Sequence, residues 1–241
     1  MKLQASQSVG EIAVEMPQAI PYFEQKGVDY CCGGTRTLQE ACGKAGIEVE
    51  EALQTLGRME QREDSEKAAP TWLSLQALIQ HILDKHHTYT RSQLELLVKL
   101  GSKVLVIHGQ GHAELLEVNR IVGEMARELN HHLLKEEQVA FPFLLGMEAQ
   151  EGPAEGGQNP FSYEVFRWAP QQVLLRDHEA TGELLADLRQ LTNNYVPPPG
   201  ACVTFQAFYR GLRDLEADLH QHIHLENNVL FPMAEKLAAN R

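Results

Sequence analysis

The chain has 241 residues, of which 33 are acidic and 21 are Lys or Arg, so its net charge is −12 with neutral histidines. This excess of negative charge repels a phosphate backbone and an anionic membrane face, which excludes nucleic acid and membrane lipid as expected partners. Nowhere do 18 apolar residues run together, and the start lacks the apolar core of an export signal. We therefore expect a cytoplasmic protein whose four cysteines stay reduced.

The first sixty residues predict a small domain of short helices. The capping-box pattern, in which a hydroxyl residue and a glutamate three positions on satisfy each other's backbone N–H groups, occurs twice. Ser8 with Glu11 forms the first example, and Thr37 with Glu40 forms the second. Between them lies the glycine-rich stretch "DYCCGGT", which predicts a turn.

A polar stretch that ends in proline, "EQREDSEKAAP", has the composition of a linker and predicts two domains, residues 1–64 and 65–241. Apolar residues recur every three or four positions almost throughout, and no alternating strand pattern appears, so the predicted fold class is all-α. The second domain contains four long helical patterns, over residues 71–100, 113–149, 161–192 and 203–238. Short breaks separate the four helices, which should therefore form an antiparallel bundle.

The bundle contains an internal repeat. The stretch "HHLLKEEQVAFP" returns about ninety residues later as "HIHLENNVLFP". His132 and His222 are 90 positions apart, and His87 and His178 are 91 apart. A helical hairpin is therefore predicted to occur twice. The Phe-Pro pair in each copy is expected to bend or end its helix, with the phenylalanine sealing the core beside it.

Six residues of this repeat are candidate metal ligands. Residues four apart on a helix stack on one face, so His132 and Glu136 share a direction, as do His222 and Glu226. The remaining two candidates, His87 and His178, lie on apolar helix faces.

A single buried histidine is more often satisfied by a neighbouring hydroxyl or carbonyl group than by a metal. Six ionisable groups in one core are different, because each buried group without a partner costs several kcal/mol. Imidazole and carboxylate ligands without thiolate suit iron, manganese or zinc. The expected arrangement is two metal ions bridged by the two glutamates, as in other bundles that hold two metals.

Helical register excludes several neighbouring residues from the ligand set. Glu137 lies about 140° round the helix from His132 and should face solvent or contact a ligand from behind. Asp177 and Glu179, on either side of His178, are candidates for a similar hydrogen bond to a ligand. Four further histidines fail the register test and are expected at the surface, with a hydrogen bond that tunes the site as the alternative for any of them: His86, His131, His220 and His224.

The chain resembles the RIC (repair of iron centres) family of di-iron proteins in six stretches: "VDYCCGGTRTLQEAC", "HILDKHH", "HHLLKEEQVAFP", "RDHEATGEL", "NNYVPPPGAC" and "HIHLENNVLFP". The likeness covers nearly the whole chain, and a vicinal Cys-Cys-Gly-Gly turn joined to such a bundle is specific. The fold implied by the resemblance is a hemerythrin-like antiparallel four-helix bundle preceded by a small helical domain.

The resemblance also implies a cofactor and a function. The cofactor is a pair of non-haem iron ions joined by an oxo bridge and by carboxylates. The implied terminal ligands are His87, His132, His178 and His222, and the implied bridges are Glu136 and Glu226. The implied function is the repair of iron-sulfur clusters damaged by nitrosative and oxidative stress, through the supply of iron. Its implied partners are damaged iron-sulfur proteins or a cluster-assembly scaffold, with nitric oxide or oxygen species meeting the di-iron site.

The vicinal cysteines Cys31 and Cys32 lie in a glycine-rich turn, where a thiol can be exposed and reactive. We expect them to serve in redox chemistry, in docking to a partner or in iron transfer, and the alternative is a buried structural role for one of them. Cys42, on an apolar helical face, and Cys202, after a run of prolines, are predicted to be structural.

Two other functions stay open at this point. A di-iron site that reduces nitric oxide or oxygen species with turnover would make the protein an enzyme. A site that binds oxygen or nitric oxide reversibly would make it a sensor or carrier like hemerythrin. The sequence decides neither the question of turnover nor whether the chain forms a homodimer.

Overall fold

The computed structural model describes residues 3–61, 72–149 and 163–239. Within these ranges there is no β-strand, and one isolated β-bridge joins Ser8 and Thr37. The prediction of an all-α fold is therefore confirmed. The N-terminal elements are α1 (Val9–Glu15), a 3₁₀ turn (Pro17–Ala19), α2 (Ile20–Lys26), α3 (Leu38–Ala45) and α4 (Val49–Gln61). The later helices are α5 (Leu75–His81), α6 (Thr88–His108), α7 (Glu114–Lys135), α8 (Phe141–Ala149), α9 (Tyr163–Trp168), α10 (Pro170–Leu191), α11 (Val203–Leu225) and α12 (Phe231–Ala239).

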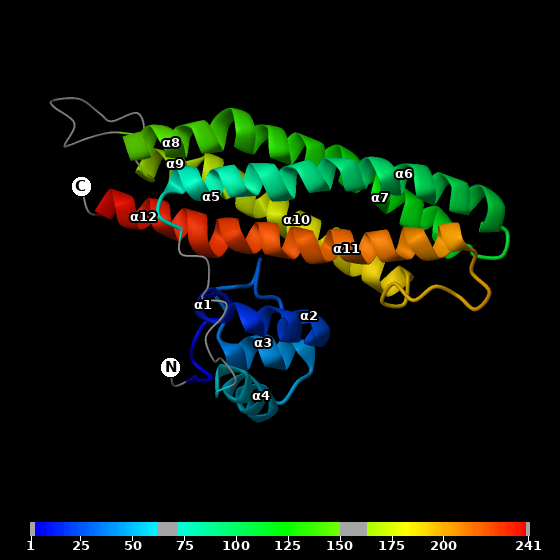
Figure 1. The fold of residues 1–241 in the computed structure, drawn as a ribbon, viewed down its shortest axis with the longest axis horizontal. Coiled ribbons are helices and arrows are strands. Elements are labelled where there is room, and N and C mark those ends of the chain that lie inside the picture. The colour runs from blue at the N-terminus through cyan, green and yellow to red at the C-terminus, as the bar shows by residue number, and fades with distance from the viewer. Residues whose placement is uncertain (1–2, 62–71, 150–162, 240–241) are drawn as a thin grey trace.

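The later helices form a long four-helix bundle (Figure 1). Helix α6 packs along both α7 and α11, and α10 packs along α7. The first long helix continues to His108, beyond the predicted end at residue 100. Gly101 lies inside it, where an added Cβ would come within 2.9 Å of the Phe208 ring, so the glycine allows close packing and does not end the helix.

Three π-helical segments interrupt the long helices, at Ile82–His87, Glu136–Ala140 and Glu226–Leu230. Each of the last two lies directly before a Phe-Pro pair, and α8 and α12 continue through Pro142 and Pro232. Of the two expected outcomes, a bent or an ended helix, the second is therefore wrong. A π turn is wider than an α turn and already disrupts the regular hydrogen-bond ladder where the proline lacks its N–H. The helix therefore resumes after the proline with few further hydrogen bonds lost.

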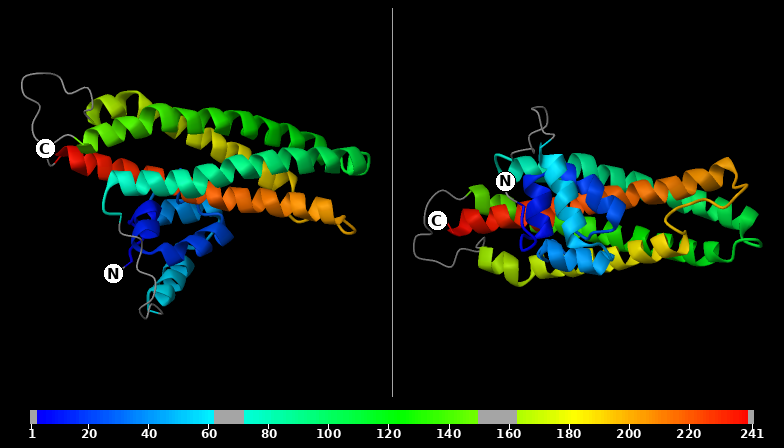
Figure 2. Two further views of the ribbon diagram at one scale, coloured as in Figure 1. Left: turned by 45° about the horizontal axis from the view of Figure 1, so that its top comes forward. Right: turned by 90° about the horizontal axis from the view of Figure 1, so that it is seen from below.

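The N-terminal helices form a compact group that lies against α11 (Figure 2). Both predicted capping boxes are present, with Ser8 and Glu11 at the start of α1 and with Thr37 and Glu40 at the start of α3. The apolar core of this group includes Ile223 of α11, which anchors it to the bundle. The predicted domain boundary near residue 65 lies outside the described residues.

Two apolar clusters fill the bundle. One includes Leu94, Val118 and Leu215, and the other includes Leu78, Leu144 and Phe231. The buried polar residues of the repeat lie in the stretches of chain between these clusters. Among the described helices, none combines the length and the apolar character needed to cross a membrane.

Candidate metal centre

The structure brings all six candidate ligands together in the interior of the bundle. Each of them is at most 4% exposed. They are His87 at the end of the first π-helical segment, His132 on α7, Glu136 at the start of the second π-helical segment, His178 on α10, His222 on α11 and Glu226 at the start of the third. Three of the six thus lie in π-helical segments, where the local widening of the helix is a common feature of functional sites.

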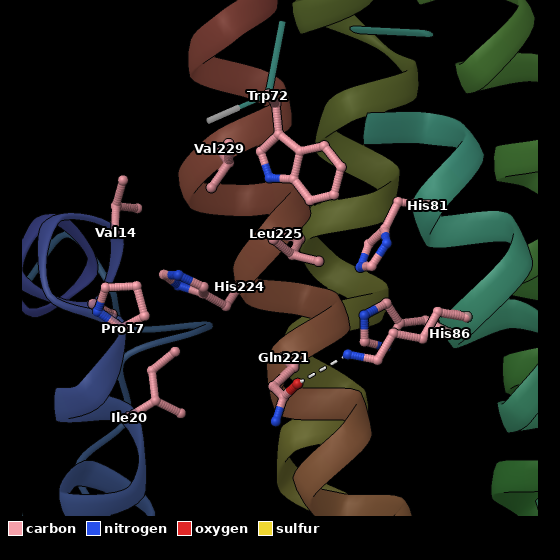
Figure 3. Close-up of a pocket in the computed structure, with 12 residues that line it drawn as sticks. Val14, Pro17, Ile20, Trp72, His81, His86, Gln221, His224, Leu225 and Val229 are labelled. Carbon is pink, nitrogen blue, oxygen red and sulfur yellow. Dashed lines mark hydrogen bonds between the residues drawn. The ribbon is translucent and has the colours of Figure 1, made fainter. Parts of the chain in front are cut away.

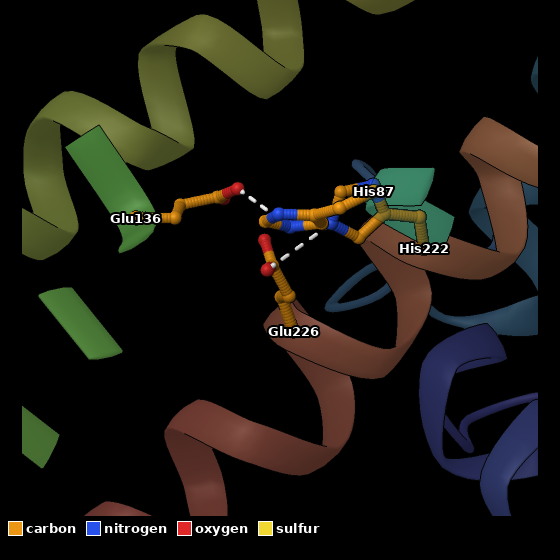
Figure 4. Close-up of side chains that lie close together, drawn as sticks. All are labelled: His87, Glu136, His222 and Glu226. Carbon is orange, nitrogen blue, oxygen red and sulfur yellow. Dashed lines mark hydrogen bonds and ion pairs between the residues drawn. The ribbon is translucent and has the colours of Figure 1, made fainter. Parts of the chain in front are cut away.

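The six side chains form two groups of four, and both glutamates belong to both groups. His87 and His222 complete the first group, and His132 and His178 complete the second, with the possible ligand atoms of each group within 4.8 Å of one another. Figure 4 shows the first group, in which Glu136 and Glu226 approach the two imidazoles from different helices. This arrangement offers two adjacent metal positions that share both carboxylates.

The Nε2 atom of each of the four candidate histidines faces a carboxylate. Nε2 of His132 lies 2.8 Å from Glu136 Oε1, and Nε2 of His87 lies 3.2 Å from Glu136 Oε2. Across the centre, Nε2 of His178 lies 3.1 Å from Glu226 Oε2, and Nε2 of His222 lies 3.2 Å from Glu226 Oε1. Each glutamate therefore contacts one histidine of each group, as a bridging carboxylate must.

The unsatisfied atoms of the centre fit a metal ion. Nε2 of His87, both carboxylate oxygens of Glu136 and Oε2 of Glu226 are fully buried and lack a partner in hydrogen-bond geometry. Unpaired polar atoms inside a protein cost free energy, and binding to a divalent cation removes that cost. An all-imidazole and carboxylate donor set suits iron, manganese or zinc.

The electrostatics of the centre favour positive charge. Burial by itself would raise the pKa of the Glu136 carboxyl, but the contacts with His132 and its neighbours hold that pKa well below its usual value. Burial would lower the pKa values of His132 and His178, but the glutamates raise them to about 9 and about 10. Two carboxylates in the core thus stabilise any cation beside them, a proton or a metal ion.

In three of the four candidate histidines, Nδ1 contacts a side chain outside the ligand set, and this contact orients the ring. Nδ1 of His87 lies 2.7 Å from Glu137, which also forms a two-pronged ion pair with Arg91. Nδ1 of His132 lies 3.2 Å from Asp177, as expected for a residue that supports a ligand. Such contacts fix the ring orientation and the tautomer that presents Nε2 to a metal.

The third supporting residue, Asn227, was missed in the sequence. Its Oδ1 lies 2.9 Å from Nδ1 of His178. The internal repeat contains the signal, since Asn227 lies 90 positions after Glu137, just as His178 lies 91 after His87. Each copy therefore places a supporting residue directly after its glutamate.

Two histidines expected at the surface are buried, so that expectation is wrong for His86 and His224. The His86 ring stacks on His222 with ring centroids 5.6 Å apart, and its Nδ1 lies 3.0 Å from Asp218. His224 is covered by the N-terminal helices, and Asn228 lies 3.0 Å from its Nδ1. Register along one helix could not reveal this, because the covering groups come from elsewhere in the chain.

His86 and His224 line a cavity of about 190 Å³ between the N-terminal group and the bundle (Figure 3). Pro17 and Ile20 form the wall on the N-terminal side, and Trp72 closes one end. The N-terminal helices thus cover the side of the bundle next to the His87 and His222 group.

The vicinal thiols, which the sequence places in a separate N-terminal domain, lie close to the candidate metal centre. Cys32 Sγ lies 3.5 Å from the carbonyl oxygen of His178, and Asn227 donates its amide to the carbonyl oxygen of Cys31 at 3.2 Å. Asn228 also donates to Tyr30 in the same turn. The thiols are separate from the six core ligands, but one residue joins them to a histidine of the centre.

Both vicinal thiols are free, and they differ in acidity. The Cys31 S–H lies 3.9 Å from Cys32 Sγ and donates to it, which lowers the pKa of Cys32 and raises the pKa of Cys31. Cys31 is buried and Cys32 is partly exposed. Cys42 is buried in the core of the N-terminal helices, whereas Cys202 is exposed. The expected structural role of Cys42 agrees with its burial.

The fold and the centre define a metal-binding helical bundle of the hemerythrin type. Residues 78–160 and 163–234 match the hemerythrin HHE cation-binding domain, and residues 5–60 match a domain of unknown function called ScdA_N. The chain is 34% identical over 230 residues to the iron-sulfur cluster repair protein YtfE of Escherichia coli K12 (DH10B) and to that of Shigella boydii serotype 4. Each alignment covers 95% of this chain and 96% of the relative. The chain therefore belongs to the RIC family of iron-sulfur cluster repair proteins.

Proposed function

We propose that this protein restores damaged iron-sulfur clusters in the cytoplasm by supplying iron from a non-haem di-iron centre. The observation that carries the proposal is the pair of buried ligand groups that share Glu136 and Glu226. Similarity along 95% of the chain to proteins named for iron-sulfur cluster repair supports the same function.

The proposed iron ligands follow from the two groups. His87 and His222 would hold one ion, His132 and His178 would hold the other, and Glu136 and Glu226 would contribute to both. Six protein ligands would not fill the coordination of two ions, so a small molecule such as nitric oxide could bind there. When bound, the two ions supply both a reactive centre and the iron to be delivered.

The protein's own residues control how firmly iron is held. Glu137 and Asp177 are carboxylates that increase the basicity of His87 and His132. Asn227, a neutral amide, supports His178 without adding charge. The vicinal thiols Cys31 and Cys32 lie beside that histidine and are proposed to take part in iron transfer or in docking to the damaged protein.

The decisive experiment is a repair assay. An iron-sulfur enzyme whose cluster has been damaged with nitric oxide or peroxide is incubated with the iron-loaded protein, and recovery of its activity is measured. We expect recovery with the wild-type chain and none with the Glu226→Leu variant. Consumption of nitric oxide with a reductant, without cluster recovery, would instead identify a reductase. Reversible oxygen binding without recovery would identify a carrier or sensor.

A further inference from the structure

The two vicinal thiols have the spacing of a metal chelate. Cys31 Sγ and Cys32 Sγ lie 3.9 Å apart. Two thiolates bound to one tetrahedral ion, each with a metal–sulfur bond of about 2.3 Å, lie roughly 3.8 Å apart. The side chains therefore need almost no movement to bind one ion together.

A carboxylate lies next to the thiols. Asp29 Oδ1 is 3.6 Å from Cys31 Sγ, and Asp29, Cys31 and Cys32 offer three ligand atoms within 4.8 Å of one another. The same oxygen accepts the backbone N–H groups of Cys32 and Gly33, which holds the turn in shape. Arg36 pairs with the other oxygen, Oδ2, and leaves Oδ1 directed at the thiols.

The thiols open into a cavity of about 300 Å³ between the N-terminal helices and the bundle. Its lining includes Glu24, Glu216 and His220 beside the two cysteines. Glu24 contacts His220 at 2.8 Å, and Glu216 forms an ion pair with Arg189. The space accommodates an ion at the thiols together with water in its remaining positions.

The thiols are also anchored to one half of the metal centre. Cys32 Sγ lies 3.5 Å from the backbone carbonyl of His178, and Asn227 bridges the His178 ring and the Cys31 carbonyl oxygen. The nearer group of the centre is thus the one that contains His132 and His178. The same contacts keep the thiol turn on the bundle.

We propose that Cys31, Cys32 and Asp29 form a second metal site, which takes a thiophilic divalent cation and receives Fe²⁺ from the position held by His132 and His178. The inference rests on the proposed function for the identity of the ion, and on the thiol geometry for the site itself. Binding of one ion releases the two S–H protons to solvent. The ion keeps its divalent state, so no electron moves.

The test of the site uses Cd²⁺ as the probe, on the full-length chain stripped of metal. Binding at the thiols produces an ultraviolet thiolate-to-cadmium absorption band, which imidazole and carboxylate ligands do not produce. We expect the band to appear in the wild-type chain, whose histidine and glutamate positions bind Cd²⁺ without contributing to it, and to disappear in the Cys31→Ser, Cys32→Ser double variant. The Cys202→Ser variant, which removes the exposed cysteine, should keep the full band.

A second variant tests the site with both cysteines in place, so that the result does not depend on the folding of the double variant. Asp29→Asn keeps an oxygen that accepts the N–H groups of the turn but removes the charge. It should weaken Cd²⁺ binding at least roughly tenfold, the smallest effect known even for residues that only support a metal ligand. An absent band in the wild type, a band that survives in the double variant, or unchanged affinity in Asp29→Asn would each overturn the proposed site.

The transfer step is tested separately, by loading the chain with Fe²⁺ and measuring iron loss to an external chelator. The double cysteine variant should hold the same amount of iron as the wild type and release it several-fold more slowly. Equal release rates would overturn the transfer role. Absence of iron from the bundle in both proteins would contradict the proposed function, while leaving the cadmium result to decide the thiol site.

Discussion

Asn227 lies 2.9 Å from the Nδ1 atom of His178 and, through its other amide atom, donates a hydrogen bond to the carbonyl oxygen of Cys31. We expect Asn227→Ala to lower metal affinity by about 10-fold to 100-fold, the range known for residues that orient a ligand. The same substitution should speed alkylation of Cys32, because the turn loses its tie to the bundle. Metal titration and thiol labelling followed by mass spectrometry measure the two effects.

Gln138 provides the matched control for this prediction. It follows Glu137 in the first copy of the repeat, as Asn228 follows Asn227 in the second, and it is exposed. Gln138→Ala should leave both metal affinity and thiol labelling unchanged. If Asn227→Ala changes neither quantity, the contact with His178 does not orient the ring.

Substitution of Glu136 or Glu226 should change the iron content of the protein, whereas substitution of Glu137 should change only its iron affinity. Glu136→Leu or Glu226→Leu removes a carboxylate shared by both metal positions, so iron should fall from about two ions per chain to less than one. Glu137→Gln should keep the iron content under saturating iron but weaken affinity roughly tenfold, because Glu137 contacts His87 from behind. Elemental analysis measures the content, and Glu128→Gln on the exposed face of α7 is the control. Equal losses from all four variants would contradict the assignment.

Metal removal should destabilise the bundle. The two buried carboxylates then depend on imidazole protons for compensation, and binding to the folded state no longer contributes its free energy. Thermal denaturation followed by circular dichroism should show the midpoint falling by roughly 5 to 10 °C when a strong chelator strips the protein. The Glu136→Leu variant should show little further fall on chelation. An identical fall in that variant would mean that the chelator acts elsewhere.

The bundle should fold without the N-terminal helices. A chain that begins at Ala69 retains all six candidate ligands, so it should bind iron. It exposes Ile223, which the N-terminal core covers, and loses the contacts of Asn227 and Asn228 with the thiol turn. We therefore expect the shorter chain to bind iron with lower affinity, because Asn227 then holds the His178 ring less firmly. A soluble, helical bundle that retains no iron would show that the N-terminal helices contribute to the centre.

Docking of the thiol turn should depend on Gly34. A Cβ at this position would collide with the Asn228 side chain and come within 2.9 Å of the carbonyl oxygen of Tyr30. Gly34→Ala should therefore cost about 1 to 3 kcal/mol of unfolding free energy. Gly43→Ala, on the exposed side of α3 with no neighbour within 4 Å, should be neutral or stabilise by up to about 1 kcal/mol. Urea denaturation distinguishes these outcomes, and equal stability of the two variants would contradict the close approach.

Helix boundaries were predictable where a local signal marked them. Both capping boxes lie where the sequence predicts them, because a cap involves residues three apart and needs no other part of the chain. The continuation of α6 past Gly101 was not predictable, since the Phe208 ring that explains the glycine comes from α11. The π turns before Pro142 and Pro232 also left no clear local signal.

The sequence by itself determined which side chains of the repeat share the interior, because residues four apart on a helix must lie on one face. It therefore selected His132 with Glu136, and His222 with Glu226, before any contact between helices was known. Only the tertiary structure decided which side chains contact the ligands through Nδ1 and which residues lie next to the centre. The contacts of Asn227 with His178 and Cys31 join elements 49 and 196 residues apart in the chain. Such contacts depend on how the N-terminal helices dock onto the bundle, which no periodicity within one helix can encode.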